Sequence, residues 1–253
     1  MTSTNDDILV ARDLTKEFRG FRAVDGVDLN VRRGSIHAMI GPNGAGKTTC
    51  FNLLTKFLQP TAGTIMFDGQ DVTSWTADRI ARKDMVRSFQ ISAVFPEMTA
   101  AQNVRIALQR RRGHNFDFWR SEKRLHRFDD EARELLSRVG LAEFADEKAA
   151  ALSYGRKRAL ELATTVALDP RLLLLDEPMA GMGREDVARI TELIREIARD
   201  RTILLVEHNL SVVETLSDRI TVLARGAVLA EGDYAEVSNN PDVIDAYIGA
   251  GHD

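Results

Sequence analysis

Residues 41–49 decide the fold of this chain; they read Gly41, Pro42, Asn43, Gly44, Ala45, Gly46, Lys47, Thr48 and Thr49. This is the pattern GxxxxGK[ST], and it follows an apolar run at residues 35–40, as a loop between a strand and a helix does. Glycines in such a loop turn backbone N–H groups toward a polyphosphate, while Lys47 adds positive charge and Thr48 offers a hydroxyl to Mg²⁺. We call residues 41–49 the phosphate loop and predict that they bind a nucleotide.

Composition sets wider bounds. The 253 residues, 44% of them hydrophobic, are enough for one α/β domain with an inserted subdomain. A net charge of −4 gives no general attraction to nucleic acid. No apolar stretch reaches the roughly 20 residues of a membrane span and residues 1–7 are polar, so we expect a soluble, cytosolic chain. The single cysteine, Cys50, excludes an internal disulfide and a cysteine-based zinc cluster.

Apolar runs and breakers outline the first half of the chain. Strands are expected at residues 8–14, 24–31, 35–40 and 64–67. A helix should begin at the phosphate loop and run to about Leu58, before the breakers at residues 59–63. From about residue 98 to 150 the pattern becomes helical and rich in charge, which indicates a helical insertion.

The second half returns to α/β structure. Residues 172–175 and 202–206 are continuous apolar runs, as in parallel strands buried on both faces. A crossover helix at 184–199 should join them. Residues 219–231 are predicted to form a hairpin about Arg225 and Gly226, and Asn240 with Pro241 should begin a short C-terminal helix.

Two acids follow the first of these buried strands. Asp176 is the kind of residue that holds Mg²⁺ or its water, and Glu177 can orient and deprotonate an attacking water. The alternative is a pair of solvated acids before a helix, because Pro178 permits a helix to start nearby.

Five segments together resemble the ATP-binding subunit of an ABC transporter. In order, they are GPNGAGKTT at 41–49, Ser88-Phe89-Gln90, Leu152-Ser153-Tyr154-Gly155, LLLLDEP at 172–178 and Glu207-His208. The resemblance spans essentially the whole chain. It implies an α/β P-loop NTPase (RecA-like) core at 1–90 and 160–253 with an antiparallel β subdomain, and an inserted α-helical subdomain at 91–159.

The resemblance also implies a composite site for ATP and Mg²⁺. Two such subunits close head to tail, so that Ser153, Tyr154 and Gly155 of one address the nucleotide on the phosphate loop of the other. The helix that follows Gly155 makes this chemically reasonable, because a helix N-terminus attracts phosphate. Taken alone, Leu-Ser-Tyr-Gly is an ordinary loop. We call residues 152–155 the signature segment.

Three further roles are implied by the resemblance. Gln90 contacts Mg²⁺ or the attacking water, so that the implied metal ligands are Thr48, Gln90 and Asp176. His208 steadies the γ-phosphate and Glu177, although a lone histidine after a strand is more often structural. Phe18 matches the aromatic residue that stacks on adenine, and its alternative is core packing.

Finer details resemble the ATPases of branched-chain amino acid importers, notably Val86 to Gln90, Tyr154 with Ala180-Gly181, and the ending at 240–249. That implies a second ATPase subunit, identical or paralogous, two transmembrane permeases, indirectly a solute-binding protein, and a place on the inner face of the membrane. The runner-up is a lipid or polysaccharide exporter. A soluble ABC ATPase is a less favoured alternative, because its usual long coiled coil or second cassette is not seen in this sequence. A kinase or GTPase is disfavoured because the sequence has no Asn-Lys-x-Asp motif.

Three positions depart from the general ABC pattern. Arg156 replaces glutamine in the signature, Gly183 replaces a common aspartate, and Asn209 follows His208 in place of aspartate. The contacts of Arg156 are therefore open, and Gly183 cannot make the carboxylate contact across a dimer.

Two stretches allow a further hypothesis each. Residues 110–127 interleave seven Lys or Arg with Phe116, Phe118 and Trp119, which is a solvated helical face or a surface for lipid headgroups or membrane subunits. Cys50 lies just past the phosphate loop, so ATP should slow its alkylation if the thiol is accessible. The alternative is a buried, unreactive cysteine.

Overall fold

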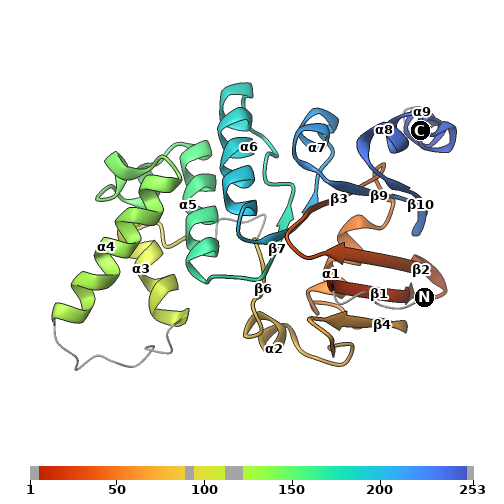
Figure 1. The fold of residues 1–253 in the computed structure, drawn as a ribbon, viewed down its shortest axis with the longest axis horizontal. Helices are drawn as coiled ribbons and strands as arrows, with labels where there is room; N and C mark the ends of the chain where they lie inside the picture. Colours follow the sequence, from red (N-terminus) through yellow and green to blue (C-terminus); the bar gives the residue numbers. More distant parts are fainter. Residues whose placement is uncertain (1–5, 89–93, 112–121, 250–253) are drawn as a thin grey trace. The chain divides into compact units, whose positions relative to one another are not determined.

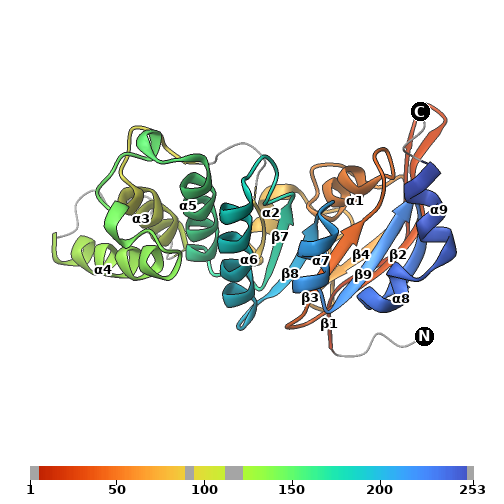
Figure 2. The same ribbon diagram turned by 90° about the horizontal axis from the view of Figure 1, so that it is seen from above.

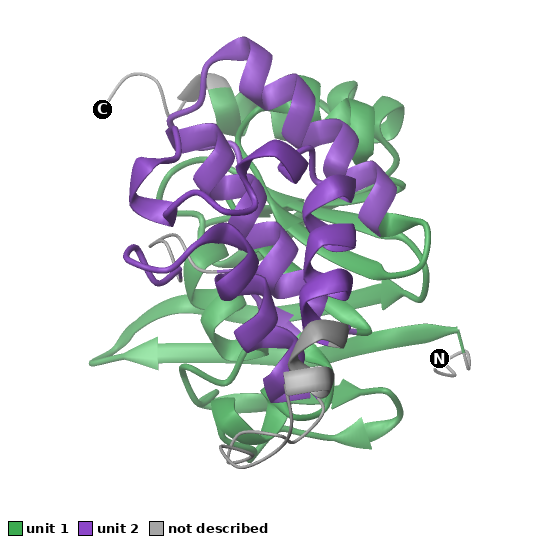
Figure 3. Cartoon of the chain, turned by 90° about the vertical axis from the view of Figure 1, so that its left-hand side faces the viewer, with its two compact units in different colours: residues 1–85, 171–177, 198–253 green, residues 86–170, 178–197 purple. Residues whose placement is uncertain are grey.

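The structure is a computed structural model that describes residues 6–88, 94–111 and 122–249. The chain divides into two compact units, shown in green and purple in Figure 3. The first unit contains residues 1–85, 171–177 and 198–253, and the second contains 86–170 and 178–197.

A six-stranded sheet has the order β10-β9-β3-β8-β7-β6 (Figure 1). Its strands are β3 (Ile36–Ile40), β6 (Met85–Arg87), β7 (Leu172–Asp176), β8 (Thr202–Val206), β9 (Arg219–Ala224) and β10 (Ala227–Gly232). Neighbours β9, β3, β8 and β7 are parallel, whereas β9 and β10 form the predicted antiparallel hairpin. Every residue of β3, β7 and β8 is buried, which confirms the parallel strands predicted from continuous apolar runs.

Both faces of this sheet are covered in the first unit. On one face, Ala38 and Ile40 of β3 pack with residues of α7 (Leu210–Leu216), α8 (Tyr234–Ser238) and α9 (Pro241–Gly249), which flank the sheet in Figure 2. On the other face, Met39 packs into a core with Phe51 and Leu54 of α1 (Lys47–Leu54). The alternation of residues 38, 39 and 40 between the two faces is the period of a strand.

The helix after the phosphate loop is shorter than its sequence suggests. Helix α1 ends at Leu54, four residues before the expected end near Leu58. Lys56 adopts a left-handed backbone, with φ 63°, which a continuing α-helix cannot contain. Its ammonium group donates a hydrogen bond to the carbonyl of Thr73, so a tertiary contact accompanies the early stop.

A second, antiparallel sheet confirms the predicted β subdomain. Its order is β2-β1-β4-β5, formed by β1 (Asp7–Phe18), β2 (Phe21–Arg32), β4 (Ala62–Phe67) and β5 (Gln70–Asp71). The two first strands exceed the predicted 8–14 and 24–31, because β1 and β2 pair along nearly their whole length. Buried residues of this sheet, such as Leu14, Val27 and Ile65, share one core with α1. The short helix α2 (Ala77–Ala81) follows and is capped by Thr76.

The second unit is helical, apart from the last residues of β6. It contains α3 (Ala100–Arg111), α4 (Glu122–Arg138), the 3₁₀ turns η1 (Ala142–Phe144) and η2 (Ala149–Ala151), α5 (Tyr154–Ala167) and α6 (Arg184–Ala198). Helices α3, α4 and α5 contact one another in all three pairs. Residues of α4, α5 and α6, among them Leu135, Val166 and Leu193, line one small cavity, so α6 packs in the same bundle.

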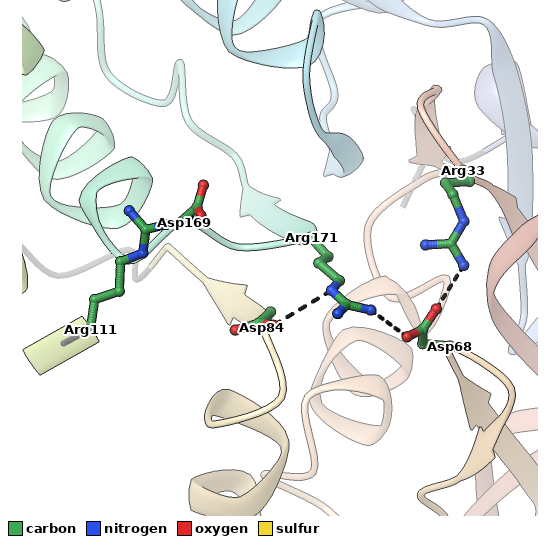
Figure 4. A network of polar contacts seen from close by, with 6 residues as sticks. All are labelled: Arg33, Asp68, Asp84, Arg111, Asp169 and Arg171. Carbon is green, nitrogen blue, oxygen red and sulfur yellow. Dashed lines mark hydrogen bonds and ion pairs between the residues drawn. The ribbon is translucent and has the colours of Figure 1, made fainter. Parts of the chain in front are cut away.

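A chain of charges joins four loops of the first unit (Figure 4). Asp68 accepts hydrogen bonds from Arg33, at 2.7 Å, and from Arg171, which also pairs with Asp84. These bonds hold the pKa of the Asp68 carboxyl below its usual value, Arg33 being the largest cause. Arg171 precedes β7, so the network lies at the edge of the parallel sheet opposite to the phosphate loop. Its members are partly exposed, and we assign it a modest role in stability.

His37 gives the fold a pH dependence. It lies in β3, is 1% exposed, and its Nε2 is 2.8 Å from the hydroxyl of Thr221. Burial lowers the pKa of His37 to about 4, and the charge of Arg219 acts in the same direction. An unfolded histidine has a pKa of about 6.5, so between these values the unfolded state binds the extra proton. Stability is therefore fully present above pH 6.5 and is lost as the pH falls toward 4.

Replacing His37 with glutamine should remove this part of the pH dependence. Between pH 7 and pH 5 we expect the free energy of unfolding of the wild type to fall by about 2 kcal/mol more than that of His37→Gln. Urea unfolding of both proteins at the two pH values measures the difference. Parallel losses in the two proteins would show that other groups carry the dependence.

Candidate nucleotide site

Glycines shape the phosphate loop at the end of β3. Gly41, Gly44 and Gly46 have φ values of 149°, 76° and 99°, which residues with a Cβ rarely adopt. A Cβ on Gly46 would lie 2.4 Å from the carbonyl oxygen of Ala23, so the loop also approaches β2 closely. The loop is further held by Gly226, whose N–H donates to the Ala45 carbonyl at 3.0 Å. These contacts within the chain hold the backbone of the loop in this shape.

Lys47 is the buried cation of the loop. Its Nζ donates to the carbonyl oxygens of Gly41, at 2.6 Å, and Pro42, at 2.9 Å. Burial lowers the pKa of Lys47, while the charges of Glu177 and Asp176 act in the opposite direction. The two acids are therefore close enough to Lys47 for their charges to influence its pKa. Thr48, the next residue, is exposed.

Asp176 and Glu177 stand at the end of β7. Asp176 is the last residue of the strand and is 2% exposed, whereas Glu177 is half-buried. The backbone of Glu177 is left-handed, with φ 46°, and its N–H donates to the carbonyl of Val206 at 2.9 Å. A non-glycine residue in this region is strained, and such strain is concentrated at functional sites. The strained backbone thus occurs at the residue where the chain leaves β7.

The turn after β8 presents His208. His208 is exposed, while its neighbour Glu207 is fully buried and accepts the backbone N–H groups of His208 and Asn209 at 3.1 and 3.3 Å. Asn209 in turn caps α7 by accepting from the N–H groups of Ser211 and Val212. Asn209, which departs from the ABC pattern, therefore serves as the N-cap of α7. Sequence reasoning missed the supporting role of Glu207, although an acid directly after a buried strand was visible.

Phe18 is the last residue of β1 and is 44% exposed, which rules out the alternative of core packing. The ammonium group of Lys16 lies 5.2 Å from the centre of its ring. An exposed aromatic face is what stacking on an adenine requires. Phe18, the phosphate loop, the two acids and His208 all belong to the first unit.

The signature segment lies in the second unit, at the start of α5. Ser153 is exposed and occupies the N-cap position, but its side chain makes no capping hydrogen bond. Tyr154 donates a hydrogen bond from its hydroxyl to the carbonyl of Ala180 at 2.9 Å. Gly155 is buried because the carboxylate of Asp186 lies against it. Sequence reasoning missed Asp186, since only the fold brings residues 155 and 186 together.

The structure also gives the contacts of the unusual residues. The guanidinium group of Arg156 stacks 3.8 Å above the ring of Phe144 in η1, so this side chain has a partner within its own unit. No atom lies within 4 Å of the position that a Cβ on Gly183 would take, and its φ is not positive. Neither packing nor backbone conformation therefore explains a glycine there.

Some predictions fall outside the described residues. Gln90 lies in the segment 89–93, and most of the basic, aromatic stretch at 110–127 lies in 112–121 or has undescribed side chains. Within the described part of the chain, no three His, Cys, Asp or Glu side chains gather as a metal site. Nor does any helix described there have the length and hydrophobicity that a membrane span needs.

Cys50 is a core residue. It is fully buried in the cluster around α1, and burial raises the pKa of its thiol to about 12. The predicted protection by ATP depended on an accessible thiol, and that condition is wrong. A buried thiol with such a pKa is inert, so its alkylation reports unfolding and not nucleotide binding.

A glycine-rich loop after a central parallel strand, a buried lysine within it, and two acids at the end of a second strand of the same sheet define a P-loop nucleotide hydrolase. Comparison with known proteins narrows the class. The sequence profile of the ABC transporter family matches residues 24–180, and that of the branched-chain amino acid ATP-binding cassette transporter matches residues 227–253.

Individual relatives agree with these matches. The chain is 42% identical over 252 residues to the high-affinity branched-chain amino acid transport ATP-binding protein BraF of Pseudomonas aeruginosa, covering 96% of this chain and 98% of that protein. It is 40% identical over 249 residues to LivG of Escherichia coli, with the same coverage. Among solved structures, the ADP conformation of an ATP-binding cassette of an ABC transporter matches with a TM-score of 0.81 and 28% identity, covering 96% of this chain and 99% of that one.

The chain belongs to the family of ATP-binding subunits of ABC transporters. It binds ATP, and as a member of this family it is an ATPase whose hydrolysis is coupled to transport. The RecA-like fold expected from the sequence is confirmed.

Proposed function

We propose that this chain powers the import of branched-chain amino acids. The proposal is supported by the names of the relatives at 40–42% identity and by the separate match of residues 227–253 to the branched-chain amino acid group. The observation that carries the chemistry is the placement of three groups in the same parallel sheet. The buried Lys47 lies in the phosphate loop after β3, Asp176 and Glu177 lie at the end of β7, and the charges of both acids act on the pKa of Lys47.

In the proposed reaction, a water attacks the γ-phosphorus of ATP. Glu177 accepts a proton from that water, the new P–O bond forms, and the bond to the β-phosphate oxygen breaks, giving ADP and inorganic phosphate. Lys47 leaves its bonds to the Gly41 and Pro42 carbonyls and pairs with phosphate oxygens. His208, on the turn held by Glu207, contacts the γ-phosphate, and Phe18 stacks on the adenine.

The donor set at the phosphate loop suits Mg²⁺. An exposed threonine hydroxyl at Thr48 and a carboxylate at Asp176 are oxygen ligands, and Mg²⁺ in nucleotide sites takes one or two such groups together with phosphates and waters. When bound, the ion neutralises charge on the β- and γ-phosphates. Gln90 is the further ligand that the family resemblance implies.

The signature segment is proposed to serve the ATP of a second subunit. Ser153 has an exposed hydroxyl that is not used for capping, and it stands at the N-terminus of a 14-residue helix. Hydroxyl, backbone N–H groups and helix dipole together favour a γ-phosphate at that point. Binding of ATP is then coupled to closure of two subunits, identical or paralogous.

We further propose that the closed pair works on two permease subunits at the inner face of the membrane, with a solute-binding protein delivering the amino acid. An exporter of lipid or polysaccharide is the alternative that the experiment must exclude. Specificity for the cargo lies in those other subunits.

Uptake of radiolabelled leucine, isoleucine and valine by cells of the source organism tests the proposal. Cells whose only copy carries Lys47→Ala should take up these amino acids no faster than cells that lack the gene, because the phosphate loop has lost its cation. Uptake of glutamate provides the control for general energy metabolism. Normal uptake of all three amino acids in the Lys47→Ala cells would contradict the assigned cargo.

A further inference from the structure

Asp186 lies against the backbone of the signature segment. A Cβ placed on Gly155 would be 2.4 Å from the carboxyl carbon of Asp186 and 2.5 and 2.6 Å from its two oxygens. The whole carboxylate therefore faces the Cα of Gly155, and only glycine allows this approach. Both residues belong to the second unit, so the contact is internal to one compact body.

A second contact joins the same two segments. The hydroxyl of Tyr154 donates to the carbonyl of Ala180, and a Cβ on Gly181 would lie 3.8 Å from that hydroxyl oxygen and 3.9–4.0 Å from atoms of the Tyr154 ring. Residues 180–186 thus contact two successive residues of the signature segment, Tyr154 and Gly155. Position 183 lies within this segment and is glycine, where the general ABC pattern has an aspartate. A carboxylate is nevertheless present one helical turn later, at position 186.

The charge of Asp186 is placed where an anion is attracted. Gly155 lies in the first turn of α5, and Asp186 itself lies in the first turn of α6, so the carboxylate is near the positive ends of two helices. Arg189 donates to one of its oxygens at 2.8 Å, and the side chain remains 32% exposed. A negative group of the chain itself therefore lies at the helix end where Ser153 occupies the N-cap position.

We propose that Asp186 is a positioning residue whose charge sets the ATP concentration at which two subunits close. Its carboxylate holds the signature segment in shape, and it also repels the γ-phosphate that the partner brings to the N-terminus of α5. This inference rests on the proposed closure of two subunits around ATP. According to this inference, the repulsion between the negative Asp186 carboxylate and the negative γ-phosphate opposes closure, and ATP binding must outweigh it.

The experiment uses ATP-dependent dimerisation of the full chain carrying Glu177→Gln, in which bound ATP is not consumed. Asp186→Asn keeps the size of the side chain and removes its charge. Light scattering measures the ATP concentration at which half of the maximal amount of dimer has formed. We expect this concentration to fall by about three- to tenfold, which is the size of effect that the interaction with one screened charge produces. The shift should shrink at high salt. Loss of a negative charge at a helix N-terminus should lower the thermal stability of the monomer slightly, and such a loss does not by itself make closure easier.

Glu185→Gln is the matched control, because it removes the same charge from the same helix turn without touching Gly155. It should leave the midpoint unchanged, and Asp186→Glu should keep a midpoint above that of Asp186→Asn. An unchanged or higher midpoint for Asp186→Asn, or an equal shift for Glu185→Gln, would overturn the inference. Failure of the Glu177→Gln chain itself to dimerise with ATP would instead refute the proposed closure.

Discussion

Glu177→Gln should lower ATP turnover by about 10²–10⁴-fold, the usual contribution of a general base, while ATP binding is preserved. The side chain keeps its size and loses only the ability to accept a proton. Its backbone is already held in the left-handed region by the bond to Val206, and glutamine tolerates that conformation as well as glutamate does. Steady-state phosphate release and binding of a fluorescent ATP analogue measure the two effects.

A control separates the proton transfer from a general effect of glutamine. Glu214→Gln makes the same replacement on an exposed position of α7 in the same unit, and it should hydrolyse ATP like the wild type. Turnover by Glu177→Gln at the wild-type rate would remove Glu177 from the mechanism. Loss of both turnover and ATP binding would instead mean that its charge is needed to hold the nucleotide.

Local patterns predicted the parts of the fold that local rules control. The runs at 172–175 and 202–206 are strands because continuous apolar residues suit a sheet covered on both faces, and β7 and β8 are buried throughout. Asn240 begins α9 as predicted, with its side chain accepting the N–H of Asp242 at 2.9 Å. Where tertiary contacts decide, the prediction failed: α1 stops at Leu54, and Lys56 bonds to Thr73 seventeen positions away.

The candidate site divides in the same way. The phosphate loop could be predicted because its glycines, lysine and threonine are adjacent in the chain and each has a chemical reason to be there. The contacts of Arg156 with Phe144 and of Asp186 with Gly155 could not, because they depend on which helices meet. The exposure of Phe18 and the burial of Cys50 are likewise set by packing, which hydrophobicity alone does not resolve.

Gly46→Ala should damage both stability and nucleotide binding. The new methyl group would meet the carbonyl oxygen of Ala23 at 2.4 Å, and this is a backbone atom of β2 that no side-chain rotation can remove. Together with the strain at φ 99°, the expected cost is about 3 kcal/mol, or a fall in Tm of roughly 6–12 °C. Distortion of the loop should weaken ATP binding by at least about tenfold. Thermal unfolding and titration with a fluorescent ATP analogue measure the two losses.

Gly44→Ala distinguishes close approach from backbone strain. Gly44 also has a positive φ, 76°, but no atom lies within 4 Å of its added Cβ. Its replacement should cost only the conformational strain, about 1 kcal/mol. Equal losses in the two variants would mean that backbone conformation alone limits the loop. A larger loss at Gly46 would mean that β2 fixes the start of α1, because strand and loop then touch at a point where only glycine fits.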